Sequence, residues 1–197
     1  MKERILVTGG TGYIGSHTVV ELQNSGYDVV IVDNLSNSSA DVVDNIEKVS
    51  GIRPAFEKLD CLDLEGMDKL FTKYPGIKGI IHFAASKAVG ESVQKPLLYY
   101  RNNLVSLINL LELMPKHGVE GIIFSSSCTV YGQPDVLPVT EEAPIKKAES
   151  PYGNTKQINE EIIRDTVASG SPINAIMLRY FNPCLLYTSP SPRDAHE

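Results

Sequence analysis

Tyr152 and Lys156 stand four positions apart in the polar run 150–156. In a helix, residues at i and i+4 lie on one face a turn apart, so an ammonium would lie beside a phenol. A free phenol has a pKa of about 10, and a tyrosine that takes protons at neutral pH needs that pKa lowered by roughly 3 units. A fixed cation nearby gives such help. Two unrelated surface side chains would show the same spacing. Whether the pair is functional therefore depends on the elements around it.

The first of these elements is a glycine-rich loop near the start of the chain. The apolar run 5–7 predicts a buried strand, and a helix-like stretch follows the loop as far as Gly26. Between them, Gly9, Gly12 and Gly15 have the wide spacing of a dinucleotide-binding loop, and Gly10 fits the narrower spacing. Glycines there permit a tight turn and a close approach of a pyrophosphate to the backbone. An ordinary glycine-rich turn is the alternative.

Asp33 follows directly after the next predicted strand, residues 28–32, and lies 18 positions beyond Gly15. A carboxylate at that place accepts hydrogen bonds from adenosine ribose hydroxyls and repels a 2′-phosphate. The position therefore favours NAD over NADP as the cofactor. A turn or helix-capping aspartate is the alternative interpretation.

Strand and helix patterns then alternate along the chain, which predicts an α/β fold with a doubly wound parallel sheet of the Rossmann type. Ligands of such sheets bind at the carboxyl ends of the strands. The expected amphipathic helical stretches include 97–113 and 152–167. The expected strands are residues 5–7, 28–32, 54–58, 79–83, 121–124 and 173–178.

Residues that follow these strands are the candidate binding groups. Asp60 follows the third strand, and the small residues Ala84 and Ala85 follow the fourth, where a cofactor would lie close to the backbone. A serine-rich segment, 125–132, follows the fifth strand. One of its hydroxyls would share a substrate proton with Tyr152, although a solvated capping loop is the alternative.

Composition bounds the remaining possibilities. The chain has 197 residues, of which 42% are hydrophobic and 21% charged, as in an ordinary globular domain. Its net charge of −6 gives no basic footprint for nucleic acid. We expect no membrane segment, because no long apolar run is present. Three widely spaced cysteines form no metal pattern and favour a reducing cytoplasm.

Taken together, these motifs resemble the extended short-chain dehydrogenase/reductase family, and within it the enzymes that epimerise UDP-sugars. The glycine loop and the Tyr152/Lys156 pair are shared across that family. The runs 82–92, 95–100, 125–132 and 179–183 resemble the epimerases, and residues 87–92 are the most specific part. The resemblance covers residues 1–183.

The resemblance implies NAD-dependent epimerisation at C4 of UDP-glucose and UDP-galactose, a step of galactose metabolism, through a transient 4-keto sugar. Tyr152, Lys156 and Ser127 would be the catalytic residues. Substrate contacts would come from Lys87, Ser127, Tyr152, Phe181 and Asn182. Cofactor contacts would come from Gly9, Gly12, Tyr13, Ile14, Gly15, Asp33, Asn34, Asn37, Ser38, Asp60, Cys61, Phe83, Ala84, Ala85, Lys87, Asn102, Tyr152, Lys156 and Tyr180.

The resemblance also separates this chain from a neighbouring reaction and sets its expected limits. The 4,6-dehydratases of the family carry an Asp–Glu pair where this chain has Cys128 and Thr129, so dehydration is disfavoured. A homodimer through the stretches 97–113 and 152–167 would fit the family's habit. Ordinary core-facing stripes are the default interpretation of the same two stretches.

Residues 184–197 depart from the family pattern and are predicted to be an unstructured tail, with the substrate-capping domain largely missing. We therefore expect residues 1–183 to form the NAD-binding domain and interpret the tail as a truncation or sequence junction. Two alternatives stay open: a catalytically inactive NAD-binding fragment, or a related enzyme acting on another nucleotide sugar.

Overall fold

A parallel β-sheet forms the centre of the molecule. The computed structural model describes residues 2–181. The sheet has six strands in the order β3-β2-β1-β4-β5-β6, as predicted for a doubly wound fold. The strands are β1 (Arg4–Thr8), β2 (Asp28–Asp33), β3 (Ala55–Lys58), β4 (Ile77–His82), β5 (Gly121–Ser127) and β6 (Asn174–Tyr180).

The strand order reverses at β1, which pairs with β2 on one side and β4 on the other. The chain leaves β1 toward one edge of the sheet and returns to β4 on the other side. This topological switch opens a crevice at the carboxyl ends of β1 and β4, which is where doubly wound sheets bind ligands. The glycine loop follows β1 directly and therefore lies at that crevice.

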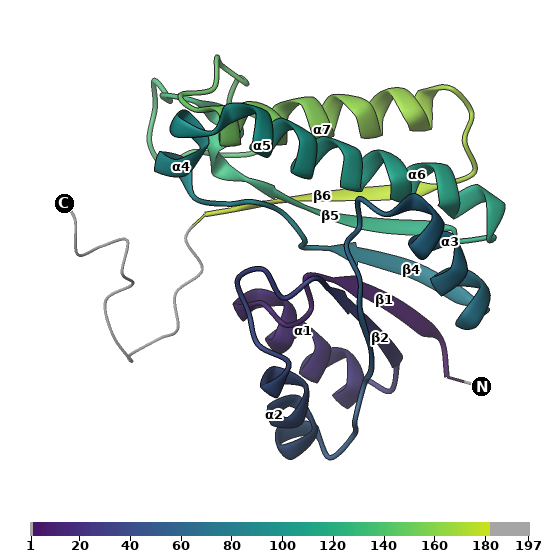
Figure 1. Ribbon diagram of the computed structural model, residues 1–197. Helices are drawn as coiled ribbons and strands as arrows, with labels where there is room; N and C mark the ends of the chain where they lie inside the picture. The colour runs from purple at the N-terminus through teal and green to yellow at the C-terminus, as the bar shows by residue number, and fades with distance from the viewer. Residues whose placement is uncertain (1, 182–197) are drawn as a thin grey trace.

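Helices cover both faces of the sheet (Figure 1). Two of them, α1 (Tyr13–Asn24) and α2 (Asp41–Ser50), lie on one face below β1 and β2. On the opposite face lie α3 (Leu64–Lys73), α4 (Val89–Gln94), α5 (Pro96–Tyr100), α6 (Ser106–Lys116) and α7 (Pro151–Ala168). Two short turns complete the described elements: the π-helical η1 (Arg101–Val105) and the 3-10 turn η2 (Cys128–Tyr131).

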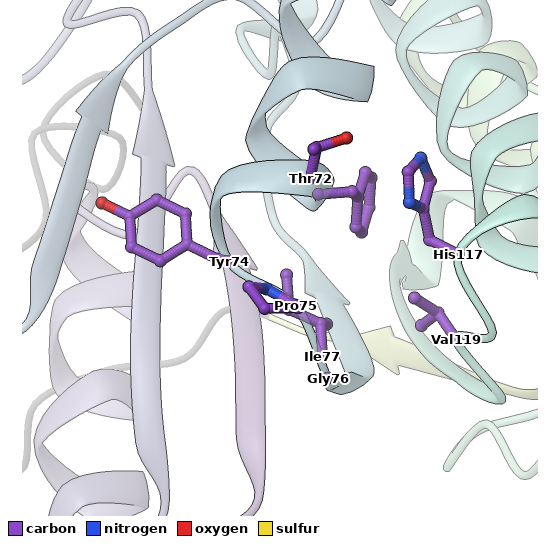
Figure 2. Close-up of a pocket in the computed structure, with 8 residues that line it drawn as sticks. Thr72, Tyr74, Pro75, Gly76, Ile77, His117 and Val119 are labelled. Atoms are coloured by element: carbon purple, nitrogen blue, oxygen red, sulfur yellow. The ribbon is translucent and has the colours of Figure 1, made fainter.

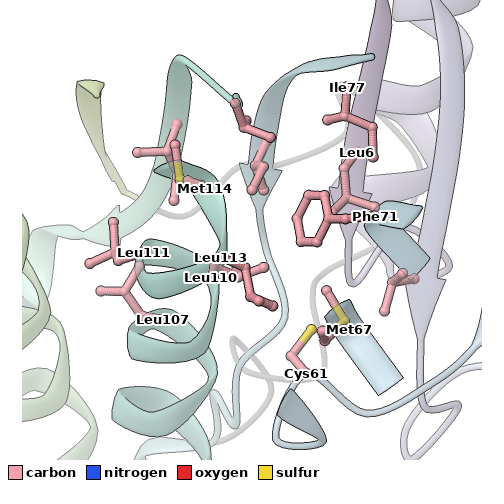
Figure 3. Packing of buried hydrophobic residues seen from close by; sticks show 14 of the residues in the cluster. Leu6, Cys61, Met67, Phe71, Ile77, Leu107, Leu110, Leu111, Leu113 and Met114 are labelled. Atoms are coloured by element: carbon pink, nitrogen blue, oxygen red, sulfur yellow. The ribbon is translucent and has the colours of Figure 1, made fainter. Parts of the chain in front are cut away.

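Apolar side chains from the strands pack against both helical layers. The larger cluster joins Leu6 of β1 and Phe124 of β5 to residues of α3, α6 and α7 (Figure 3). A smaller cluster joins Val7 and Ile31 to Val19 of α1. Since the central strands are buried on both faces, they have nearly continuous apolar sequences such as that of β2. This packing fixes the strand ends that carry the candidate site.

Two details differ from the sequence expectation. The stretch 97–113 is not one regular helix, because η1 separates α5 from α6. Within η1, the side chain of Asn103 bonds to the backbone of Ser86. The second difference is that β5 continues beyond the expected end at residue 124 to Ser127, where it pairs with Tyr180 of β6. The parallel backbone ladder therefore extends strand structure into a sequence of weak β-propensity.

Asn182 and the predicted tail, residues 184–197, lie outside the described residues. The boundary proposed at residue 183 lies there as well. None of the helices described is long and apolar enough to span a membrane.

Candidate active site at the carboxyl ends of β1, β4 and β5

The helix that carries Tyr152 begins immediately before it. Ser150 caps α7, since its hydroxyl accepts a hydrogen bond from the backbone N–H of Gly153 at 3.1 Å. Pro151 follows at the first helical position, where its missing N–H costs no hydrogen bond. Tyr152 and Lys156 therefore occupy successive turns on one face at the helix start, as their spacing predicts.

Lys156 is buried, with 3% of its surface exposed. Its Nζ donates a hydrogen bond to the carbonyl oxygen of Ser125 at 2.6 Å and lies 4.8 Å from the centre of the Phe124 ring. The same Nζ lies 5.8 Å from the centre of the Tyr152 ring. Burial lowers the pKa of Lys156 to about 8, which still leaves the ammonium predominant at neutral pH. The structure thus brings a cation to the Tyr152 ring.

Ser127 lies at the carboxyl end of β5, two residues beyond the Lys156 contact. It is buried, and it caps η2 by accepting a hydrogen bond from the backbone N–H of Thr129 at 3.3 Å. The hydroxyl still has a proton to donate, since capping uses only an acceptor lone pair. Strand β5 therefore presents Ser125 to the lysine and Ser127 at the strand end.

The glycine loop forms a cradle that admits no side chain at Gly9 or Gly15. A Cβ on Gly15 would lie 2.3 Å from the carbonyl oxygen of Gly9, and one on Gly9 would lie 2.7 Å from the backbone nitrogen of Ala84. Gly9 also has φ +69°, in the left-handed region. The loop leads into the N-terminus of α1, whose unpaired N–H groups favour an anion. The backbone therefore fits the pyrophosphate of a dinucleotide.

Asp33 is buried at the end of β2, beside this loop. Its carboxylate accepts hydrogen bonds from the backbone N–H groups of Thr11 at 3.2 Å and Leu35 at 2.9 Å. The hydroxyl of Ser38 donates to it at 3.3 Å and bonds the Thr11 hydroxyl at 2.7 Å. The structure therefore ties the predicted ribose-binding carboxylate to the glycine loop itself. Thr11 is not among the residues predicted from the sequence, and its place inside the glycine motif is the available signal.

Three further predicted cofactor residues, Asn34, Asp60 and Cys61, follow the ends of β2 and β3. Asn34 donates to the Asp60 carboxylate at 2.9 Å, and both side chains remain partly or fully exposed. The side chain of Cys61 instead packs into the apolar core, close to Met67 (Figure 3). Burial raises the pKa of the Cys61 thiol to about 12, assisted by the charges of Asp60 and Asp33. The thiol therefore points away from the crevice, and only its backbone would face a nucleotide.

Other candidate cofactor residues collect after β4 and β6. The ring centres of Phe83, which follows β4, and Tyr180, which ends β6, lie 6.4 Å apart, so the two rings lie close together at the carboxyl ends of the strands. Asn102, on η1, donates to the Ser86 hydroxyl at 3.1 Å. The side chains of Lys87 and Phe181 are exposed. Exposed too are Tyr13 and Asn37, while Ile14 is partly buried.

Two polar groups that the sequence did not single out support the site from within. His82 is buried at the end of β4, and its Nδ1 lies 2.7 Å from the hydroxyl oxygen of Thr8. Burial, followed by the charge of Lys156, lowers the pKa of His82 to about 3, so the ring is neutral. Asn103 bonds the backbone of Ser86 and donates to the Thr155 hydroxyl at 3.0 Å. Polar residues on otherwise apolar elements were the only sequence signal.

The cavity shown in Figure 2 lies at the other end of the sheet. Its volume is about 290 Å³, and it lies between the end of α3, the start of β4 and the residues that follow α6. Phe71 and His117 stack along it with ring centres 5.2 Å apart. Because it opens at the amino ends of the strands, this cavity is not part of the candidate site. Among the described residues, no cluster of three or more His, Cys, Asp or Glu side chains is arranged to hold a metal ion.

A glycine cradle, an acidic second-strand end and a tyrosine–lysine pair now lie along one edge of a doubly wound sheet. The sequence profile of the NAD dependent epimerase/dehydratase family matches residues 5–196. The chain belongs to this family. The fold and the family membership predicted from the sequence are therefore confirmed.

Within the family, the chain is similar to proteins named UDP-glucose 4-epimerase. It is 50% identical over 181 residues to that of Dictyostelium discoideum and 51% identical over 179 residues to that of Bacillus subtilis. These matches cover 92% and 91% of this chain, and 52% of each relative. The human relative is 49% identical, with 54% of its length covered. The chain thus spans about half the length of the curated relatives it matches.

Solved structures of the family have the same fold. The UDP-glucose 4-epimerase of Bifidobacterium longum, in complex with NAD⁺ and UDP, aligns with a TM-score of 0.89 at 47% identity. That of Stenotrophomonas maltophila, with bound NAD and formylated UDP-arabinopyranose, aligns with 0.88 at 46% identity. The alignments cover 91% and 92% of this chain, and 53% of each structure.

Proposed function

We propose that this chain is the NAD-binding and proton-transferring part of an enzyme that interconverts UDP-glucose and UDP-galactose at C4. The observation that carries the proposal is the buried ammonium of Lys156, held by the carbonyl of Ser125 beside the Tyr152 ring. The similarity to several proteins named UDP-glucose 4-epimerase supports the choice of sugar nucleotide.

The residues at the crevice fit NAD. The backbone of Gly9, Gly12 and Gly15 would hold the pyrophosphate, since a Cβ on Gly9 or Gly15 would collide with backbone atoms. Asp33 would accept hydrogen bonds from the adenosine ribose and would repel a 2′-phosphate. The remaining cofactor contacts would come from the residues named in the sequence analysis around β2, β3, β4 and β6.

NAD, when bound, supplies a hydride acceptor and donor for C4 of the sugar. The Tyr152 phenolate would take the proton of the sugar 4-hydroxyl and, as the phenol, later return it, which requires a lowered phenol pKa. The Lys156 ammonium, 5.8 Å from the centre of that ring, would lower the phenol pKa by stabilising the phenolate. Ser127 would donate a hydrogen bond to the same sugar oxygen. Since the proton and the hydride both return, the net change is inversion at C4.

Two alternatives have specific support. Because the chain spans about half the length of its relatives, it would bind NAD without turnover if the remaining contacts to the sugar are essential. A related structure is a UDP-N-acetylglucosamine 4-epimerase, 31% identical with a TM-score of 0.80, so a different UDP-sugar is the second alternative.

Purified chain, incubated with NAD and UDP-galactose and assayed for UDP-glucose, tests the proposal. Turnover that falls about 100-fold or more in Tyr152→Phe, with NAD affinity kept, supports it. Tyr74→Phe is the matched control, since that hydroxyl donates to Glu57 far from the crevice. NAD binding without turnover supports the alternative of an inactive NAD-binding fragment. Turnover of UDP-N-acetylgalactosamine alone supports the alternative of a different UDP-sugar substrate.

A homodimer and a cytoplasmic location belong to the same proposal. Leu97 is 81% exposed and Ile108 is 37% exposed, on α5 and α6, so these helices have apolar surface for a second copy. Size-exclusion chromatography of Leu97→Lys would show a monomer if a dimer forms there. Cys61 and Cys128 are free thiols, which suits a reducing compartment.

A further inference from the structure

Glu160 lies one turn after Lys156 on α7, and its side chain is completely buried. Four hydrogen bonds reach its two carboxylate oxygens. Ser126 Oγ donates at 2.6 Å and Arg179 Nε at 2.9 Å to Oε1, while Arg179 Nη2 donates at 2.7 Å and Arg164 Nη2 at 2.6 Å to Oε2. A buried carboxylate of this kind is neither an ordinary core residue nor a surface charge.

These bonds connect three separate elements. Ser126 belongs to β5, Arg179 to β6 and Glu160 to α7. Arg179 reaches a fourth, because its Nη1 donates to the Tyr131 hydroxyl at 3.0 Å and its guanidinium lies 4.8 Å from that ring centre in η2. Arg164, by contrast, bonds the carboxylate from within the same helix.

Each connected element carries a candidate site residue beside its contact. Ser126 lies between Ser125, whose carbonyl accepts from Lys156, and Ser127 at the strand end. Arg179 immediately precedes Tyr180. The carboxylate therefore bonds α7 to β5 one residue away from the strand carbonyl that accepts from Lys156.

Stability alone gives a weak reason for this arrangement. Burial raises the pKa of Glu160, but bonds from Arg179 and Ser126 outweigh this and keep the pKa below its ordinary value, so the group is ionised. Well-packed apolar residues often stabilise a fold as well as a buried ion pair does, whereas charged pairs fix one geometry. A bidentate arginine fork fixes it in direction as well as distance.

We propose that Glu160 is a positioning residue of the active site, which holds Lys156 and Ser127 in register through its bonds to Arg179 and Ser126. The proposal rests on the proposed function for its catalytic consequence. Its structural consequence, the placement of the Lys156 ammonium on the Ser125 carbonyl, does not depend on any substrate.

The test follows Lys156 itself, in chain labelled with ¹³C at lysine Cε and titrated by NMR without cofactor. The resonance of Lys156 is assigned from its absence in Lys156→Met. The variants are Glu160→Gln, Arg179→Lys and Arg164→Ala, with Glu161→Gln as control for an exposed carboxylate on the same helix. Cooperative thermal unfolding of each variant verifies that it folds. Tyr152 and His82, the ionisable groups on α7 and β4 that face the lysine, stay unchanged throughout.

Loss of positioning and loss of charge shift this titration in opposite directions. If Glu160 positions Lys156, Glu160→Gln lets water reach the ammonium, and the pKa rises by about one unit or more toward its ordinary value. Arg179→Lys gives the same rise, since lysine lacks the fork, while Arg164→Ala and Glu161→Gln give none. A pKa that is unchanged or lower in Glu160→Gln overturns the proposal, because removal of a negative charge alone would lower it.

Where turnover is measurable, Glu160→Gln lowers kcat by about 100-fold and leaves KM for the sugar nucleotide nearly unchanged, as expected for a misplaced proton-transfer group. A rise of KM by a similar factor, with kcat unchanged, contradicts positioning. Absence of turnover in the unmodified chain would count against the proposed function and not against this inference, since the titration needs neither NAD nor sugar.

Discussion

The Nζ of Lys156 lies 2.6 Å from the carbonyl oxygen of Ser125. This bond joins the start of α7 to β5 and sets the cation beside the Tyr152 ring, 5.8 Å from its centre. The ammonium has few other solvating groups, since 97% of the residue is withdrawn from water by the fold. The bond therefore places a positive charge where a phenol would ionise. The folded chain in turn loses the hydration of that charge, which lowers its stability.

The lost hydration of the Lys156 ammonium predicts how the free energy of unfolding depends on pH. The pKa of Lys156 is about 8 in the folded chain against an ordinary 10.5, so between these values the unfolded chain binds the extra proton. The free energy of unfolding should therefore rise with pH across this window, by at most about 1.4 kcal/mol per unit. Lys156→Met should remove that rise, which urea unfolding from pH 7 to 10.5 measures.

The exposed lysine at the end of β3 is the control for this experiment. Lys58→Met changes one lysine without touching the buried site, so its stability should follow the unsubstituted chain at every pH. A difference between Lys156→Met and the unsubstituted chain that stays constant with pH would refute the buried-charge account.

The contact between Thr8 and His82 makes a second prediction. Thr8→Val keeps the shape of the side chain but leaves the buried Nδ1 of His82 without its partner at 2.7 Å. The free energy of unfolding should fall by about 1–3 kcal/mol, the cost of an unsatisfied buried polar group. Thr18→Val is the control, as that hydroxyl only bonds a carbonyl of its own helix, and a loss of about 0.5 kcal/mol or less is expected. Equal losses of unfolding free energy in Thr8→Val and Thr18→Val would show that the contact between Thr8 and His82 does not stabilise the fold.

Gly15→Ala should damage both the loop and cofactor binding. The new methyl would lie 2.3 Å from the carbonyl oxygen of Gly9, so backbone must move. We expect a stability loss of about 1–3 kcal/mol and a loss of NAD affinity measured by calorimetry. Gly90→Ala, on α4 where a Cβ meets nothing within 4 Å, should keep NAD affinity and gain up to about 1 kcal/mol of stability. Normal NAD affinity in Gly15→Ala would remove the glycine cradle from the binding site.

Asp33→Asn should weaken the preference for NAD over NADP. Removal of the carboxylate charge relieves repulsion of a 2′-phosphate, and we expect the ratio of the two dissociation constants to shift by about tenfold, or about 1.4 kcal/mol. Asp28→Asn, at the opposite end of the same strand, removes an equal charge and should leave the ratio unchanged. An unchanged ratio in Asp33→Asn would show that another group reads the ribose.

Sequence patterns predicted the larger architecture because they depend on periodicity and on glycine. Buried strands such as β2 are continuously apolar, so the parallel sheet was readable without any contact. The sequence pattern ends the fifth strand at residue 124, where the apolar run stops, and only pairing with β6 keeps Ser127 in the sheet. The break between α5 and α6 was missed because the bonds of Asn103 to Ser86 connect positions 17 residues apart.

The sequence by itself determined the type of each chemical group and its local spacing: a phenol and an ammonium one helical turn apart, a loop of three glycines, and a carboxylate at a strand end. Local backbone geometry is sufficient for these, since φ restrictions and helical periodicity act over a few residues. Tertiary structure alone decided that Lys156 is buried against Ser125 and that Glu160 binds Arg179, 19 residues away. Burial and pairing arise when distant segments exclude water together, and no local pattern encodes that.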